Sequence, residues 1–362
     1  MTKLMTTTAL TALALTISVA QAQTVNVFNW SDYIAEDTLA GFTAATGITV
    51  NYDVYDSNDT LEARMLAGSS GFDVVVPTGN YLQRQIGAGV YQPLNRDLLP
   101  NLANMDPALM ALADSFDPGN VHSVIYLWGT TGIGYNVQAV ADRMGADYVV
   151  NSWDILFNPE IAARFADCGI AVLDDHTEII PPMLRMLGRP PVTTSEEDFE
   201  AAVTALEAIR PHIRYFHSSQ YISDLANGEI CLAIGWSGDI LQAAARAEEA
   251  GNGVEVAYAI PQEGVNMWFD MLAIPADAPN PEAAHAFINY MMDAQVAANN
   301  TNYVAYPNAN AASNPMIDAE ILNDPTIYPP DETKASSWTM RPYDSRTDRI
   351  VTRLWTRLRT GQ

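Results

Sequence analysis

The stretch FDVVVPT, residues 72–78, is a short apolar run that ends in a proline and a threonine. A continuous apolar run of this length is typical of a strand buried on both faces, as in a parallel sheet covered by helices. An alternating strand pattern at residues 48–54 precedes it, and the helical sequence NYLQRQIGAG, residues 80–89, follows it. Because crossovers of this length join parallel strands, we expect an α/β protein.

The same alternation of strand and helix continues on both sides of this stretch. We expect further strands at residues 25–30, 170–175, 229–236 and 266–275, and helices at 36–46, 196–209, 240–250 and 283–292. A chain of 362 residues is too long for one ordinary core and suits two lobes, each with a mainly parallel sheet flanked by helices. No low-complexity linker separates them, so we expect strands to cross between the lobes, with residues 129–136 as one crossing. We predict lobe 1 at residues 23–130 and 258–304, and lobe 2 at 131–257 and 305–362.

The N-terminal 22 residues have the pattern of a secretory signal peptide. One cation, Lys3, precedes an apolar run at residues 9–19, and Ala20-Gln21-Ala22 provides a small-residue cleavage site. We therefore predict a signal peptide at residues 1–22 and a mature periplasmic protein that starts near Gln23.

The chain is strongly acidic, with a formal net charge of −25. Removal of the signal peptide leaves 17 basic and 43 acidic residues. This charge disfavours nucleic acid and anionic lipid as partners, and we predict no membrane insertion. Solubility or a saline habitat accounts for most of these carboxylates, so only a few need belong to a site.

Two cysteines, Cys168 and Cys231, are present. An even number of cysteines in an exported protein favours a disulfide. Two buried free thiols are the alternative.

Polar and aromatic side chains follow the predicted strands at the ends where open parallel sheets bind ligands. In three places a tryptophan stands two or three residues before an aspartate. A lone tryptophan is usually a core residue, and a lone aspartate at a strand end is usually a helix cap, but their repetition at strand ends indicates a site. The candidates in chain order are Trp30, Ser31, Asp32, Tyr33, Thr78, Asp175, Glu178, Trp236, Asp239, Trp268 and Asp270.

Carboxylates combined with indole rings favour an organic cation as the ligand. Ammonium groups pair with carboxylates, and indole faces attract the same charge through cation–π interactions. Flat aromatic walls also bury methylene groups, so an alkyl diamine or polyamine satisfies both features. A metal ion would need the carboxylates but not the tryptophans.

Other chemistries find little support in the sequence. The five histidines are scattered, and HExxH, CxxC, GxxxxGK[ST] and GxSxG motifs are absent. We therefore predict no enzymatic activity, no cofactor and no metal. A secreted hydrolase that uses a carboxylate pair, such as a glycosidase, is the alternative, and a calcium-dependent structural protein is a third possibility.

Several long segments resemble the periplasmic polyamine-binding proteins of bacterial ABC importers, most closely their putrescine-binding branch. These segments are FNWSDYI, GFDVVVPT, WGTTGIGYN, RYFHSSQYISDLANGEICLAIGWSGD, and NANAA with PPD further on. The resemblance implies a class II periplasmic-binding fold, in which two α/β lobes close on the ligand and a membrane permease receives it from the closed form. We expect a monomer.

The same resemblance implies a ligand set and a disulfide. It assigns residues 30–33 and Thr78 to the first lobe, and Glu178, Trp236 and Asp239 to the second. It completes the cage with Trp268, Asp270 and Tyr306, and it pairs Cys168 with Cys231. Tyr306 comes from the resemblance and not from the strand-end pattern.

Two positions depart from the putrescine-binding pattern in a direction that favours a longer ligand. Trp268 stands where that branch often has phenylalanine, and Asp175 adds a carboxylate where it has a small residue. We therefore expect spermidine to bind as well as putrescine.

Overall fold

The computed structural model describes residues 23–361, and the predicted signal peptide lies outside the described residues. The strands form one nine-stranded sheet in the order β2-β1-β3-β9-β4-β7-β5-β6, with β8 paired to β4. Their bounds are β1 Thr24–Trp30, β2 Thr49–Tyr55, β3 Val74–Val75, β4 Ser123–Asn136, β5 Ile170–Val172, β6 Ile213–Phe216, β7 Leu232–Trp236, β8 Val256–Ala259 and β9 Asn266–Ala273.

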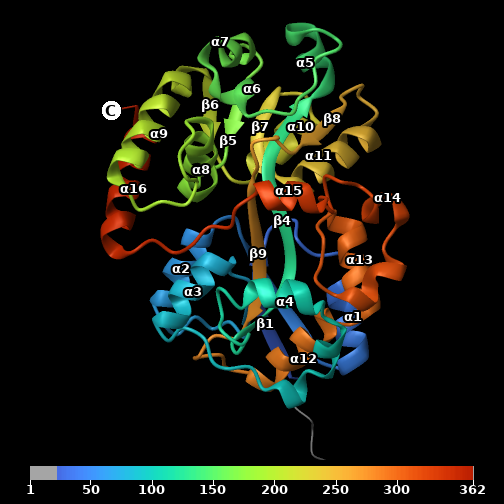
Figure 1. The fold of residues 1–362 in the computed structure, drawn as a ribbon. Helices are drawn as coiled ribbons and strands as arrows, with labels where there is room; N and C mark the ends of the chain where they lie inside the picture. Colours follow the sequence, from blue (N-terminus) through green and yellow to red (C-terminus); the bar gives the residue numbers. More distant parts are fainter. Residues whose placement is uncertain (1–22, 362) are drawn as a thin grey trace, which may run out of the picture.

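Strand β4 runs through both halves of the molecule (Figure 1). Its first part pairs with β9, from Ser123 to Thr131, and its second part pairs with β7 and β8. On either side lie parallel strands, β2-β1-β3 in one half and β7-β5-β6 in the other. The predicted α/β class with crossing strands is confirmed, and one continuous sheet joins the two halves.

Helices cover the faces of this sheet in each half (Figure 1). Around the half that contains β1 lie α1 Thr38–Thr46, α2 Asn58–Leu66, α3 Gly79–Gly87, α4 Pro107–Ala113, α12 Pro281–Met291, α13 Ala294–Val304 and α14 Ala319–Leu322. Around the half that contains β7 lie α5 Val137–Met144, α6 Asp154–Phe157, α7 Pro159–Ala162, α8 His176–Met186, α9 Glu196–Ile209, α10 Gln220–Ala226, α11 Ser237–Ala250 and α16 Ser345–Thr360, while α15 Asp331–Ser336 lies over β4.

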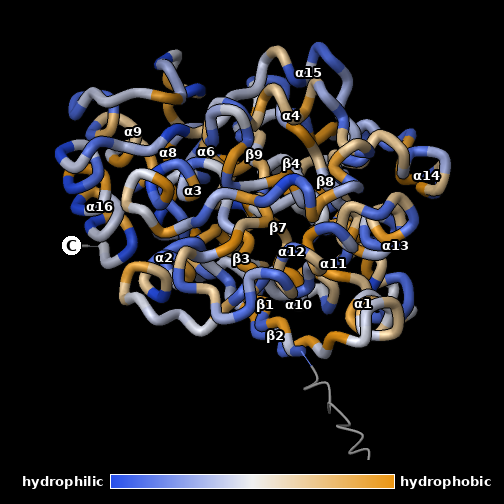
Figure 2. The backbone as a smooth tube through the Cα atoms, turned by 90° about the horizontal axis from the view of Figure 1, so that it is seen from below, coloured by the Kyte–Doolittle hydropathy of each residue, from blue (hydrophilic) through white to orange (hydrophobic). Residues whose placement is uncertain are grey.

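Two apolar cores support the two halves. Phe42, Leu82 and Phe287 belong to the core around β1 and β9, whereas Trp153 and Tyr221 belong to the core around β5 and β7. In the view from below, hydrophobic stretches gather on the central strands (Figure 2). Within residues 23–361, no helix has the length and apolarity needed to span a bilayer.

The segment after residue 304 contributes to both cores. Tyr306 and Ala309 pack in the core around β1 and β9, and Val351 and Leu358 pack in the other. These contacts do not define where one lobe ends and the other begins, so the predicted lobe boundaries stay a prediction.

The apolar run at residues 72–78 forms a shorter strand than its sequence predicts. It is buried from Phe72 to Pro77, but the regular strand is confined to Val74–Val75, and Thr78 forms an isolated bridge with Asp270. The carboxylate of Asp73 accepts hydrogen bonds from the backbone and side-chain nitrogens of Asn26, at 2.8 and 2.9 Å. The backbone N–H of Asp73 also donates to the carbonyl of Asn26 at 2.7 Å, and Pro77 has no N–H group to extend the ladder.

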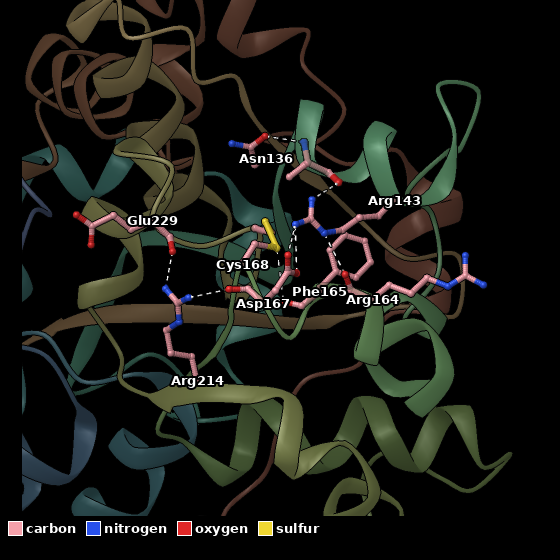
Figure 3. Close-up of a disulfide and its surroundings, with 10 residues drawn as sticks. Asn136, Arg143, Arg164, Phe165, Asp167, Cys168, Arg214 and Glu229 are labelled. Carbon is pink, nitrogen blue, oxygen red and sulfur yellow. Dashed lines mark hydrogen bonds and ion pairs between the residues drawn. A yellow bond between two sulfur atoms is a disulfide. The ribbon is translucent and has the colours of Figure 1, made fainter.

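Cys168 and Cys231 form a disulfide, as the resemblance implies (Figure 3). It links the turn before β5 to the residue before β7, across a sequence separation of 63 residues. Closing a loop of this length contributes about 4 kcal/mol in the chain-entropy model. Arg143 donates to the carboxylate of Asp167 at 3.0 Å, and Arg214 donates to the carbonyl of Glu229 at 2.6 Å, so the surrounding loops are tied as well.

Candidate ligand-binding site

A cavity lies beside the middle of β4, where the two halves of the sheet meet. Trp236 on β7 and Asn266 on β9 both pair with Thr131 of β4, and Trp268 pairs with Gly129. The side chains around the cavity leave about 480 Å³ unfilled by protein atoms, counted out to its opening. Its lining residues are Trp30, Ser31, Tyr33, Asp56, Asn58, Thr78, Asp175, Glu178, Ser218, Trp236, Asp239, Trp268, Asp270 and Tyr306.

Of the twelve candidate residues, the structure brings eleven together around this cavity, and Asp32 is the exception. Three lining residues were not among the candidates: Asp56, Asn58 and Ser218. Asp56 directly follows β2, and Ser218 comes two residues after β6. Applying the strand-end rule to these two strands would have found both residues.

Aromatic rings wall the cavity from both halves. The rings of Trp30, at the end of β1, and Trp236, at the end of β7, meet edge to face at a centroid distance of 5.7 Å. Trp268 and Tyr306 meet at 5.4 Å. A Cβ on Gly129 would lie 2.7 Å from the indole of Trp268, so a glycine on β4 is what allows this ring its close approach.

Asp270 is buried and bonded to hydroxyl groups. Tyr33 donates to one carboxylate oxygen at 2.9 Å, and Thr78 donates to the other at 2.6 Å. Burial raises the pKa of Asp270 to about 7, the charge of Asp239 adds to the rise, and the two hydroxyl bonds oppose it. Asp270 shares a face of β9 with Trp268, because residues two apart on a strand point the same way.

Asp239 has similar surroundings in the first turn of α11. It accepts hydrogen bonds from the hydroxyls of Tyr221 and Tyr306, each at 2.7 Å. Burial raises the pKa of Asp239 to about 6, and these two bonds oppose the rise. A Cβ on Gly238 would lie 2.5 Å from the Tyr306 ring, so the glycine leaves room for that tyrosine.

Two more acids lie at the N-terminus of α8. Asp175 is the N-cap residue, and one of its oxygens accepts from the backbone N–H and the hydroxyl of Thr177, at 2.8 and 2.7 Å. Burial alone would raise the pKa of Asp175, but bonds and charge from His176, together with the Thr177 bonds, lower it. Burial and the charge of Asp175 raise the pKa of Glu178 to about 8.

Asp32 differs from the expectation that its cation is supplied by a ligand. Its carboxylate lies 2.7 Å from the guanidinium of Arg246 on α11, and both side chains are 41% exposed. The backbone of Asp32 is in the left-handed region, with φ of 53°. This turn directs Asp32 outward, while Trp30 and Tyr33 line the cavity.

The cavity is chemically suited to a cation. Among the described residues, its lining includes five carboxylic acids and no lysine, arginine or histidine. Neutral hydroxyl and amide groups donate to four of these acids, and His176 also lies 3.6 Å from the carboxylate of Asp175. Within residues 23–361, no group of three or more His, Cys, Asp or Glu side chains is arranged to hold a metal ion.

Comparisons with known proteins give matches over most of the chain. Residues 38–329 match the family model described as bacterial extracellular solute-binding protein. The chain is 46% identical to the putrescine-binding periplasmic protein of Escherichia coli K12, over 98% of this chain and 96% of the relative. It is 49% identical to a putrescine-binding periplasmic protein of Pseudomonas aeruginosa, over 97% and 98% of the two chains.

A solved structure has the same fold. It is a spermidine/putrescine ABC transporter substrate-binding protein of Streptococcus pneumoniae, with a TM-score of 0.76 and 27% identity, and it covers 94% of this chain and 99% of its own.

Proposed function

The chain belongs to the family of bacterial extracellular solute-binding proteins, and on this premise we propose that it captures a linear polyamine and delivers it to an ABC permease. The proposal rests chiefly on one observation: buried carboxylates that have neutral hydrogen-bond donors line a cavity walled by tryptophans. The family consists of binding proteins and not of enzymes, and the hydrolase alternative finds no support among the relatives.

In the proposed complex, Asp239 and Asp270 each receive one ammonium group of the ligand. The tyrosine and threonine hydroxyls already bonded to these acids fix their orientation before the ligand arrives. Trp30, Trp236 and Trp268 contact the methylene chain and contribute cation–π attraction. The remaining lining residues, among them Ser31, Tyr33, Thr78 and Tyr306, complete the cage.

Closure of the two halves is the proposed mechanism of capture. Trp30 and Asp270 belong to the half around β1, whereas Trp236 and Asp239 belong to the half around β7. A ligand that contacts both sets binds the closed form better than the open form and so shifts the population toward closure. Export by the signal peptide at residues 1–22 would place the protein in the periplasm, where its two relatives are found.

Both putrescine and spermidine are proposed ligands. The relatives from Escherichia coli and Pseudomonas aeruginosa are putrescine-binding proteins, and the Streptococcus pneumoniae protein belongs to a spermidine/putrescine transporter. Asp175 and Trp268 both line the cavity, which supports a ligand longer than a diamine.

Thermal unfolding and calorimetry test the proposal with putrescine, cadaverine, agmatine, spermidine and spermine. We expect putrescine and spermidine to raise the melting temperature and to be recovered unchanged. An uncharged analogue such as 1,4-butanediol is the matched control and should give no shift. No response to any amine, or chemical conversion of the ligand, would contradict the proposal.

A further inference from the structure

Glu178 and Asn266 form a buried pair at the α8 end of the cavity. Glu178 is 6% exposed and Asn266 is 2% exposed. The amide nitrogen of Asn266 donates to both carboxylate oxygens, each at 3.0 Å. The amide oxygen of Asn266 is buried and has no hydrogen-bond donor among the described residues. The amide nitrogen of Asn266 is thus shared between the two carboxylate oxygens of Glu178, while the amide oxygen of Asn266 is left without a donor.

A protonated Glu178 would correct this mismatch. A carboxylic acid and an amide can form a closed pair of two hydrogen bonds, in which the acid O–H donates to the amide oxygen and the amide N–H donates to the acid carbonyl. A rotation of the Asn266 amide within the same contact would give this arrangement. An unsatisfied buried acceptor destabilises the ionised form of the pair, so the pair favours the neutral acid as long as no cation reaches it.

The charged neighbours of Glu178 act in the same direction. Asp175 on α8 and Asp270 on β9 both disfavour a negative charge on Glu178, and Tyr258 on β8 faces it as a neutral phenol. His176 lies 3.6 Å from the carboxylate of Asp175 and is the nearby basic group on α8. Burial together with these acids raises the pKa of Glu178 to about 8.

We propose that the Glu178–Asn266 pair distinguishes triamines from diamines, because Glu178 releases a proton when a triamine binds and keeps it when a diamine binds. This inference rests on the proposed function and extends it. A diamine satisfies Asp239 and Asp270 and leaves Glu178 as a neutral acid paired with Asn266. A triamine brings a third ammonium group to the α8 end, where Glu178 loses its proton to solvent and Asn266 returns to donating to both oxygens.

Asp175 provides the matched control, because it is an acid at the same end whose pKa is lowered and not raised. It is ionised before any ligand arrives, so it can attract a third ammonium group without releasing a proton. Loss of Asp175 and loss of Glu178 should therefore both weaken triamine binding but differ in proton release.

Calorimetry in buffers of different ionisation enthalpy measures the number of protons released when spermidine or putrescine binds. At pH 7 we expect spermidine to release about one proton more than putrescine. Between pH 6 and 7.5 the ratio of spermidine to putrescine affinity should rise by about tenfold per pH unit. In Glu178→Gln the additional proton should disappear, and spermidine affinity should fall at least about tenfold more than putrescine affinity. In Asp175→Asn the additional proton should decrease but not disappear, because burial and Asp270 still raise the pKa of Glu178 after the charge of Asp175 is removed.

Three results would overturn the inference while leaving amine binding intact. They are equal proton release for both amines, persistence of the additional proton in Glu178→Gln, and putrescine binding without spermidine binding. Failure of both amines to bind would overturn the proposed function and this inference with it.

Discussion

Asp32 and Asp270 are both next to Tyr33, one along the chain and the other through a hydrogen bond, yet their surroundings are opposite. Asp32 lies at the surface with the guanidinium of Arg246 at 2.7 Å. Asp270 is 4% exposed, and its partners are the hydroxyls of Tyr33 and Thr78. The protein supplies a cation to the first acid and neutral donors to the second, so the second is the one that needs a cation from outside.

Asp239 connects these two regions. It is buried like Asp270, but the charges of Asp32 and Arg246 both act on it, Asp32 raising its pKa and Arg246 lowering it. The surface ion pair thus acts on an acid of the cavity with two charges of opposite sign. An acid is therefore available for a ligand when its hydrogen-bond partners are neutral, and a nearby ion pair can shift its pKa.

Removing a carboxylate from the cavity should have the largest effect. Asp270→Asn or Asp239→Asn should each weaken putrescine binding by about 2–5 kcal/mol, because one ammonium group would lose its buried partner. Asp32→Asn is the matched control and should cost less than about 1 kcal/mol, since its partner is an exposed guanidinium. Isothermal titration calorimetry of the three variants measures the difference. Comparable losses in all three would break the distinction between the two regions.

Truncating the aromatic wall should have a smaller effect. Trp236→Ala should weaken putrescine and spermidine by about 2 kcal/mol, through lost cation–π attraction and lost burial of methylene groups. Ligand binding should also perturb tryptophan fluorescence in the wild type. Trp153→Phe serves as a control, because Trp153 is fully buried in the core around β5 and β7 and does not line the cavity. Normal affinity in Trp236→Ala would mean that the ring does not contact the ligand.

The pH dependence of binding should reflect the buried acids alone. Since the pKa of Asp270 is about 7 without a ligand, ammonium binding must displace a proton below that pH. Because Asp239, with a pKa of about 6, adds a further factor of about two, putrescine affinity should fall by about twentyfold between pH 8 and pH 6. A flat profile across this range would contradict the assignment of Asp270.

The free energy of unfolding of the unliganded protein should change with pH in the direction opposite to the putrescine affinity. A carboxyl with a folded-state pKa of about 7 holds a proton that the unfolded chain has lost above about pH 4. From this group, the free energy of unfolding is highest at low pH, decreases as pH rises toward 7, and is constant above it. Melting temperatures of the wild type and of Asp270→Asn isolate this contribution, which should be missing from the variant.

Much of the fold could be predicted because its signals are local. The helix over residues 196–209 was predicted with its observed bounds, since Ser195 caps it and Phe199, Ala202, Val203 and Leu206 recur at helical spacing. The two-residue length of β3 could not be predicted, because the strands that pair with it, β1 and β9, lie far from it in the sequence.

The residues of the candidate site also divide into those with a local sequence signal and those without one. The end of the parallel strand β7 identified the positions of Trp236 and Asp239. Asp270 lies inside β9, which pairs antiparallel with β3 and β4, and the tryptophan two residues before it was its signal. Tyr306 lies outside any such position, in the segment after α13, and reaches Asp239 through the space left by Gly238. The outward turn of Asp32 depends on Arg246, 214 residues away, and a sequence pattern around residue 32 contains no information on that partner.

The surface ion pair itself should produce the smallest effects, and they should be unequal. Each single substitution removes an exposed ion pair, which contributes about 0.2–1 kcal/mol to the free energy of unfolding. Asp32→Asn also leaves the guanidinium of Arg246 uncompensated near Asp239, where it opposes an ammonium ligand, whereas Arg246→Ala leaves a carboxylate that attracts one. We therefore expect Asp32→Asn to weaken putrescine binding more than Arg246→Ala does.

The difference between the two variants should shrink at high salt, because screening acts on exposed charges. Calorimetry at low and high ionic strength measures both quantities. Since the double variant removes both charges, its affinity should lie between those of the single variants, and a reversed order would show that Asp239 does not sense this pair.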